Sequence, residues 1–368
     1  MQCLLKDLVY YSNNKINYND LNNRNYISTE NMLPNFGGIT NSTSIPKEGK
    51  SISFQEGDIL LSNIRPYFKK LYYANFNGGC SNDVLCFRVY DNKIINSKYL
   101  YYALSTNKFI DYVVSTSKGT KMPRGDKTAI MKYELNIHDR EKQDYIVDII
   151  GSIDNKIENN NKIIDNNYKM LNLEMKKCIK NEFISIGESK HISLIKSGID
   201  KFDRNKIYLD TSSVNGYSIT DESYIITYDE RPSRANMQPI INSIWFAKLK
   251  NSPKYIIVKD YSVDLINNKI FSTGFCGLKI DKDFFNLFST YITSEEFNKN
   301  KDQLCIGATM QGVNNSDINN IKIPNFSKND CENFNIISEP IYKYIYNLTQ
   351  ENKKLLELKD LYLKKFFS

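Results

Sequence analysis

Four side chains that can recognise base edges lie within a short, proline-bounded stretch. The segment "RPSRANMQP" (231–239) carries Arg231, Arg234, Asn236 and Gln238. Arg pairs in bidentate fashion with O6 and N7 of guanine, and Asn or Gln pairs with N6 and N7 of adenine. Lys248 and Lys250 follow, and they could neutralise phosphates, which position a protein without specifying sequence. The pattern favours a DNA-contacting loop, and a solvated basic surface is the alternative.

Two further clusters of basic or polar side chains accompany turns. The segment "NIRPYFKKLYY" (63–73) interleaves cations with aromatic rings, and "KGTKMPRGDK" (118–127) is a basic turn. A later turn, "GATMQGVNN" (307–315), begins in the same way but carries neutral polar side chains. Basic residues among aromatic residues are typical of nucleic-acid contacts. The candidate contact residues in these clusters are Arg65, Tyr67, Lys69, Lys70, Lys118, Lys121, Arg124, Gln311 and Asn314.

The sequence lacks the motifs that would mark a catalytic or cofactor site. Neither G-x-x-x-x-G-K-[ST] nor G-x-G-x-x-G occurs, so no nucleotide cradle is predicted. The Asn-Pro-Pro-aromatic tetrapeptide of amino-methyltransferases is also absent. Glu174 and Lys176, with Asp165 upstream, imitate the acidic element of a metal-dependent nuclease, but a solvated helix face is the favoured interpretation. Seven scattered cysteines and two histidines predict reduced thiols and no metal site.

The composition is that of a folded protein with a moderate basic excess. Its 368 residues suffice for two domains, and the net charge of +7 fits a polyanionic partner. No apolar run of about 18 residues is present, so we expect no membrane span. The N-terminal residues show no secretory pattern. We therefore expect a cytoplasmic protein.

Two long helices are predicted, from about 142 to 183 and from about 341 to 367. Apolar residues recur at alternating gaps of three and four, with Asn at one position type, as in a coiled-coil seam. A helix that faces a globular core is the alternative. We expect the two helices to pack antiparallel, with a seam Asn from each helix fixing the register. The seam residues are Ile146, Ile150, Ile153, Ile157, Asn160, Ile164, Leu171, Ile341, Ile345, Leu348, Asn352 and Leu355.

The chain contains a tandem repeat. The stretch "KGTKMPRGDKTAIMKYELNI" (118–137) returns as "IGATMQGVNNSDINNIKIP" (306–324), with Gly119 and Gly307 offset by 188 (307 − 119). The same order is kept by "YISTENM" (26–32) with "YLDTSSV" (208–214), "CFRV" (86–89) with "GLKI" (277–280), and "LSTNKF" (104–109) with "ITSEEF" (292–297). Strand-like runs fill 50–90 and 205–280. We predict two mixed α/β domains, 1–141 and 186–332, followed by helices 142–185 and 333–368.

The chain resembles the specificity subunit of type I restriction-modification systems. The segment "EGDILLSNIRPYFKKLYYANFNGGCSNDVLCFRV" (56–89) looks like the family's Gly-Asp-Ile-Leu strand and Arg-Pro turn. The segment "GTKMPRGDKTAIMKYELNI" (119–137) looks like the Gly-Thr block that closes each target-recognition domain. The resemblance covers essentially the whole chain. It departs at "NIHDREKQDYI" (136–146), which lacks Ile-Pro-x-Pro and splits the Glu-Gln pair, so the helix starts are predicted only to within several residues.

The resemblance implies that each domain is a target-recognition domain that binds one half of a split double-stranded DNA site. The helices would act as a spacer, ~60 Å long for roughly 40 residues. The chain itself would be non-catalytic and would bind no cofactor or metal. S-adenosylmethionine, ATP and magnesium would belong to partners, namely two adenine methyltransferase subunits and, where one exists, a restriction subunit. A metal-dependent type II restriction nuclease and a coiled-coil scaffold protein are the alternatives.

Overall fold

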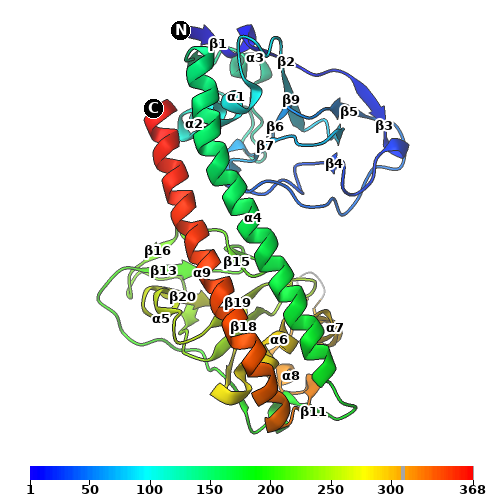
Figure 1. The fold of residues 1–368 in the computed structure, drawn as a ribbon, viewed down its shortest axis with the longest axis vertical. Coiled ribbons are helices and arrows are strands. Elements are labelled where there is room, and N and C mark those ends of the chain that lie inside the picture. Colours follow the sequence, from blue (N-terminus) through cyan, green and yellow to red (C-terminus); the bar gives the residue numbers. More distant parts are fainter. Residues whose placement is uncertain (308–310, 368) are drawn as a thin grey trace. The chain divides into compact units, whose positions relative to one another are not determined.

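The computed structural model describes residues 1–307 and 311–367, which form a mixed α/β fold of two compact units (Figure 1). Unit 1 comprises Met1–Asn160 and Gln350–Ser368, and unit 2 comprises Asn161–Thr349. Residues 308–310 and 368 lie outside the described residues, and so does the predicted Gly-x-x-Met turn at Met310. The predicted class, mixed α/β with two globular repeats and two long helices, is confirmed.

Unit 1 contains two four-stranded sheets and a two-stranded ribbon. One sheet has the order β2-β9-β6-β7 and is antiparallel throughout. The other has the order β3-β5-β8-β4, in which β4 and β8 run parallel. The ribbon pairs β1 with β10. The strands are β1 (Gln2–Leu4), β2 (Val9–Tyr11), β3 (Lys15–Asn17), β4 (Tyr26–Ile27), β5 (Lys50–Phe54), β6 (Ile59–Ser62), β7 (Leu71–Tyr73), β8 (Gly78–Cys80), β9 (Val84–Val89) and β10 (Glu134–Asn136).

The short helices of unit 1 begin where side chains cap them. Asn96, Thr106 and Asp126 accept backbone N–H groups at the starts of α1, α2 and α3. Ile146 and Ile150 of the long helix α4 join the core that these helices and the first sheet enclose. The helices are η1 (Leu5–Asp7), η2 (Tyr18–Asp20), η3 (Pro66–Phe68), α1 (Ser97–Leu104), α2 (Asn107–Ser115), α3 (Lys127–Ile130) and α4 (Arg140–Cys178).

Unit 2 has the same kinds of sheet. Its antiparallel sheet has the order β12-β21-β18-β19, and its second sheet has the order β16-β13-β20-β17, with β13 and β20 parallel. The ribbons are β11-β22 and β14-β15. The strands are β11 (Phe183–Ser185), β12 (Ile192–Leu194), β13 (Lys206–Leu209), β14 (Val214–Asn215), β15 (Ser218–Ile219), β16 (Ile225–Ile226), β17 (Ala235–Met237), β18 (Ser243–Ala247), β19 (Tyr255–Val258), β20 (Lys269–Ser272), β21 (Phe275–Ile280) and β22 (Lys322–Pro324). The helices are η4 (Ile186–Glu188), α5 (Val263–Asn268), η5 (Lys282–Phe284), α6 (Phe285–Ile292), α7 (Glu295–Gln303), α8 (Asn315–Ile318) and α9 (Lys328–Phe367).

Trp245 lies at the centre of the antiparallel sheet of unit 2. Its side chain is fully buried, and its indole N–H donates to the Ser243 hydroxyl at 2.9 Å. Gly277 on the neighbouring strand faces the ring, and a Cβ atom there would lie 2.5 Å from it. The tryptophan is therefore a core residue.

The two units repeat one order of elements. Helices α1, α2 and α3 begin at residues 97, 107 and 127, and α6, α7 and α8 begin at 285, 295 and 315, an offset of 188 (285 − 97). The long helices α4 and α9 begin at residues 140 and 328 and so keep the offset. The capping residues recur too, since Ser294 and Asn314 cap α7 and α8 as Thr106 and Asp126 cap α2 and α3. The duplication predicted from sequence blocks is therefore present in the fold.

Within unit 1, the ends of the two long helices pack antiparallel. The Asn160 side-chain amide donates to the Asn352 side-chain oxygen at 2.9 Å and to Glu351 at 2.8 Å. Asp154 lies earlier along α4, and Lys359 lies later along α9. The Lys359 ammonium group donates to the Asp154 carboxylate at 2.6 Å. The side chain of Asn160 is almost fully buried. A buried Asn tolerates few alignments, so this contact favours one register of the two helices.

Within unit 2, the remaining halves of the same helices also contact each other. Lys180, just beyond α4, forms an ion pair with Asp330 in the first turn of α9, with an N–O distance of 2.7 Å. Leu171 of α4 shares the core of unit 2 with Tyr342 and Ile345 of α9. The end of α4 therefore lies against the start of α9, again in the antiparallel sense.

The predicted seam is a helix-to-helix contact over only part of its length. Ile146 and Ile150 belong to the core of unit 1, and Leu171 and Ile345 belong to the core of unit 2. Some seam residues therefore contact the other helix, and others face the core of a globular unit. Among the other seam positions, Ile153 and Leu348 are buried, and Ile157, Ile164, Ile341, Asn352 and Leu355 are half-buried.

The helix bounds differ from those expected. Helix α4 ends at Cys178 rather than at 185, because Phe183–Ser185 form β11 and pair with β22. Helix α9 begins at Lys328, before both the predicted helix start at about 341 and the predicted segment start at 333, because the Ser327 hydroxyl accepts the Asp330 amide at 3.2 Å and caps the helix earlier.

Candidate DNA interface

Two basic stretches of unit 1 that are far apart in the sequence meet through backbone hydrogen bonds. The Arg65 amide donates to the Pro123 carbonyl at 2.8 Å, and the Gly125 amide donates to the Asn63 carbonyl at 3.1 Å. The turn after β6 and the turn that begins at Gly119 are thus adjacent. Both stretches were predicted to contact DNA, and the fold brings them together in one place.

The turn after β6 exposes two aromatic rings. Arg65 and Lys69 adopt left-handed backbone conformations, with φ of 48° and 54°, on either side of η3. The Asn35 amide donates to the Phe68 carbonyl at 2.9 Å and anchors the turn. The side chains of Tyr67 and Phe68 are 47% and 40% exposed. Exposed rings beside cations can stack on bases or sugars. Tyr67 was predicted from the sequence, and Phe68 was not.

The predicted cations of unit 1 differ in their partners and in their exposure. Lys70 donates to the Thr29 carbonyl at 2.6 Å, and burial lowers the pKa of its ammonium group. Lys69 donates to Asn107 at 2.9 Å. Lys118 and Arg124 form ion pairs with Asp126 and Asp83 at 2.6 and 3.0 Å, and Lys121 is exposed. Lys70 is therefore the candidate most committed to the fold.

Unit 2 builds the same junction with other side chains. The Val313 amide donates to the Lys248 carbonyl at 3.0 Å, and the Lys250 amide donates to the Gln311 carbonyl at 2.9 Å. These two bonds correspond to the Gly125–Asn63 and Arg65–Pro123 bonds of unit 1. One scaffold position therefore presents Arg65 in unit 1 and Lys250 in unit 2.

The stretch 231–238 contains a short strand, β17, rather than a loop alone. Ala235 and Met237 are buried, and the pairing of β17 with β20 is irregular between them, whereas Asn236 and Gln238 are half-buried. Arg234 is exposed, and its guanidinium lies close to Gly274.

Arg231 packs against Tyr228. Its guanidinium carbon is 4.2 Å from the centre of the Tyr228 ring. The Gln238 side-chain oxygen is buried and has no hydrogen-bond partner among the described residues. Arg234 and Asn236 are therefore the best placed of the four predicted residues to reach a base edge.

The other predicted residues of unit 2 have distinct environments. Lys248 is half-buried, and burial lowers the pKa of its ammonium group. Lys250 and Gln311 are exposed. The Asn314 side-chain oxygen accepts the Asp317 amide at 2.8 Å and caps α8, so it has a structural role in addition to any contact.

Lys301 supports this junction and has no distinguishing signal in the sequence. Its side chain is 1% exposed, and its ammonium group donates to the carbonyls of Ala247 and Leu249 at 3.2 and 2.9 Å. It thereby holds the segment that carries Lys248 and Lys250. A lysine among charged helix residues is normally solvated, so periodicity alone could not identify it.

The acidic element considered for a nuclease lies on α4. Glu174 forms an ion pair with Lys177, with an N–O distance of 2.6 Å, and Asp165 is exposed. Across residues 1–307 and 311–367, the structure holds no group of three His, Cys, Asp or Glu side chains that could bind a metal ion. The described part of the chain also has no helix long and apolar enough to cross a membrane.

Comparison with known proteins relates part of the chain to a known family. Residues 4–166 match the family model described as "Type I restriction modification DNA specificity domain". The chain is also 29% identical over 178 residues to the "Type I restriction enzyme HindI specificity subunit" of Haemophilus influenzae, which covers 43% of this chain and 36% of that protein. The match thus spans little more than a third of the relative's length.

A solved structure shares the fold. The crystal structure of the type I restriction-modification system S subunit from M. genitalium matches with a TM-score of 0.52 and 16% identity, over 100% of this chain and 96% of that chain. At this identity the match shows a shared fold. Residues 4–166 are thus similar to the DNA specificity domain of type I restriction-modification systems.

Proposed function

We propose that the chain selects the DNA site of a type I restriction-modification complex, with units 1 and 2 each acting as a target-recognition domain for one half of a split site. The observation that carries this proposal is the duplicated junction. The same backbone bonds hold Arg65 beside Pro123 in unit 1 and Lys250 beside Gln311 in unit 2. One scaffold with two different sets of side chains suits two different half-site sequences.

The long helices suit the role of a spacer between half-sites. Helix α4 is continuous from Arg140 to Cys178, and its register against α9 is fixed at Asn160 and Asn352. A fixed register between two helices gives a defined length. The gap between the half-sites would follow from that length.

The same helices also offer a surface for partner subunits. Their outward faces expose large apolar side chains, which soluble helices rarely carry in number unless a partner covers them. Because the chain is duplicated, we propose two methyltransferase subunits, with a restriction subunit joining where one exists. The exposed residues are Tyr145, Ile163, Met170, Leu173, Ile336, Tyr344, Leu356 and Leu361.

In this proposal the chain contributes recognition and no chemistry. S-adenosylmethionine would bind to the methyltransferase partner, and ATP and magnesium to the partners that use them. The match to the specificity family favours this function over a stand-alone nuclease or a coiled-coil scaffold. Unlike either alternative, it gives a use to both basic junctions and both helices.

Adenine methylation mapped across a host genome tests this function. With the gene present, a two-part motif should be methylated, and the motif should disappear when the gene is deleted while the methyltransferase gene is kept. Methyl transfer from labelled S-adenosylmethionine by the purified single chain would contradict the non-catalytic role. So would cleavage of DNA by that chain in magnesium.

A further inference from the structure

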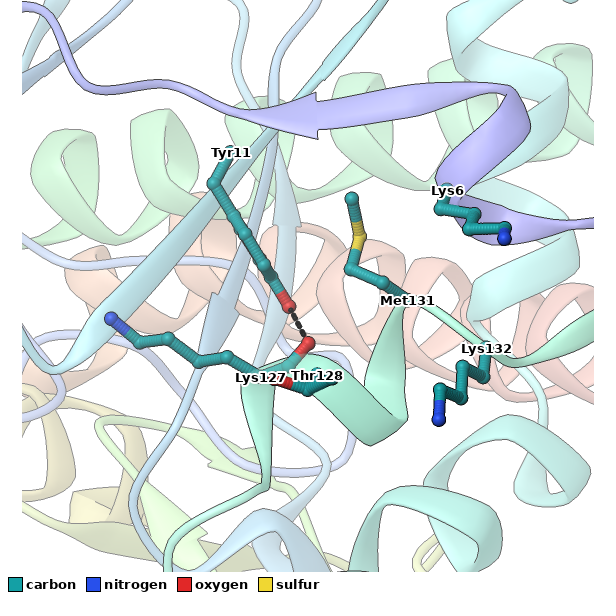
Figure 2. A pocket seen from close by; sticks show the side chains of 6 residues that line it. All are labelled: Lys6, Tyr11, Lys127, Thr128, Met131 and Lys132. Atoms are coloured by element: carbon teal, nitrogen blue, oxygen red, sulfur yellow. Dashed lines mark hydrogen bonds between the residues drawn. The ribbon is translucent and has the colours of Figure 1, made fainter.

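Unit 1 carries a lysine-lined hollow that none of the candidate contacts above includes. Lys6, Lys127 and Lys132 surround an open space of about 400 Å³ whose other walls include Tyr11 and Met131. Figure 2 shows Lys6 and Lys132 on one side of the hollow and Lys127 extending on the other. All three lysines are exposed. We refer to them as the lysine patch.

The backbone around the patch is held without help from the ammonium groups. The Lys6 amide donates to the Met131 carbonyl at 2.9 Å, and the Tyr11 hydroxyl donates to the Lys127 carbonyl at 2.9 Å. Burial raises the pKa of Tyr11, so its hydroxyl keeps the proton it donates. The hydrogen bonds named here use backbone groups of Lys6 and Lys127 and leave their ammonium groups at the surface.

Three carboxylates near the patch in the sequence have other hydrogen-bond partners. Asp126 pairs with Lys118 at 2.6 Å, Asp7 accepts the Leu4 amide at 3.2 Å, and Glu134 accepts from Gln2 at 2.8 Å. Within the described residues, no ion pair joins a carboxylate to a lysine of the patch. The patch is therefore a group of three exposed lysines that have no direct carboxylate partner among the described residues.

Unit 2 provides an internal control for the purpose of these lysines. Its Gly187 amide donates to the Asn319 carbonyl at 2.9 Å, which is the counterpart of the Lys6–Met131 bond. The positions equivalent to Lys6, Lys127 and Lys132 are Gly187, Asn315 and Asn320, and none of them is charged. The duplicated scaffold therefore folds without lysine at these positions. At these three equivalent positions, only unit 1 carries positive charge.

We propose that the lysine patch binds DNA phosphates beside the half-site that unit 1 contacts, so that unit 1 has a longer electrostatic footprint than unit 2. This inference rests on the proposed DNA-binding function. DNA is favoured over an acidic protein surface because the patch continues directly from the basic turn. Helix α3 carries Lys127 and begins after Arg124, and its capping residue Asp126 is paired with Lys118.

The test uses the full chain and a duplex that contains its methylated motif, with affinity measured over a range of salt concentrations. Each phosphate contact contributes a slope of about 0.9 in log K against log salt. Replacing the patch with the uncharged K6Q/K127N/K132N triple variant should lower the slope by roughly two to three units. Binding near 0.15 M salt should weaken by about 10- to 200-fold, with the preference among site variants unchanged.

A matched control removes the same charge elsewhere. The triple variant K169Q/K176Q/K343Q changes three exposed lysines on the long helices and should leave the slope within about half a unit of wild type. If the slope of the patch variant is unchanged and wild type binds its site normally, the lysine patch does not bind DNA phosphates. The proposed function would still stand. An equal fall in both variants also contradicts phosphate binding by the lysine patch, since net charge alone would then be the cause. Weaker capture of the methyltransferase with an unchanged slope would assign the patch to a protein. Absence of salt-dependent, sequence-specific binding by wild type would instead refute the proposed function.

Discussion

Asp154 should be the residue that ties the end of α9 to unit 1. Its carboxylate accepts from the Lys359 ammonium at 2.6 Å and from the Tyr102 hydroxyl at 2.8 Å. The side chains of Asp154 and Lys359 are 29% and 16% exposed, so solvent screens the pair only partly. A hydrogen bond to a charged group contributes about 1.5–3 kcal/mol when it is well sheltered. Allowing for the remaining exposure, Asp154→Ala should cost roughly 2 kcal/mol of local stability.

Hydrogen–deuterium exchange measures this locally, which avoids treating a two-unit chain as a single transition. Backbone amides near Lys359 should exchange about 10- to 100-fold faster in Asp154→Ala, and those of unit 2 should be unaffected. Asp148→Ala, an exposed carboxylate on the same helix, is the matched control and should change little. A double-mutant cycle with Lys359→Met should give a coupling of about 1 kcal/mol. Coupling below about 0.3 kcal/mol would refute the argument.

Three further outcomes are expected. Arg234→Ala should lose about 1–3 kcal/mol of discrimination at one half-site, measured by competition among duplex variants, and unchanged preference at every base would reject its assignment. Gly277→Ala should lower the denaturant midpoint by overpacking worth ~1–3 kcal/mol, because its Cβ would meet Trp245 at 2.5 Å; an unchanged midpoint would contradict the packing. The Lys180 ammonium holds the pKa of Asp330 below its usual 3.8, so the stabilisation of unit 2 should be full above about pH 4 and decline as pH falls through the folded pKa. Asp330→Asn should remove that acid-dependent component from pH titrations of unfolding, and an identical titration would show that the pair does not contribute.

The duplication could be predicted from the sequence because its markers are local. Capping residues and turn glycines recur at one offset, as Asp126 and Asn314 do, and the seam positions follow a helical period. Each of these signals depends on a few neighbouring residues. The fold class and the two long helices follow from them.

The arrangement of the candidate site could not be predicted in the same way. The bonds that join Asn63 to Gly125 and Lys248 to Val313 link segments far apart in the chain, and no periodicity encodes such pairs. The burial of Lys301 is likewise a result of tertiary packing. The early end of α4 has the same kind of cause, since β22 captures the segment after Cys178 as a strand.

The most direct test of the account is the methylated motif of a chain with lengthened helices. The chain passes between units after Asn160 and again before Gln350, so about four residues, roughly one turn of ~5.4 Å, would be inserted at both places to preserve pairing within each unit. With its methyltransferase, this variant should methylate the same two half-site sequences. The unspecified gap should be longer by one to two base pairs, at ~3.4 Å per pair. An active variant that keeps the original gap, or a wild-type motif that is not split at all, would contradict the claim that two recognition units are spaced by these helices.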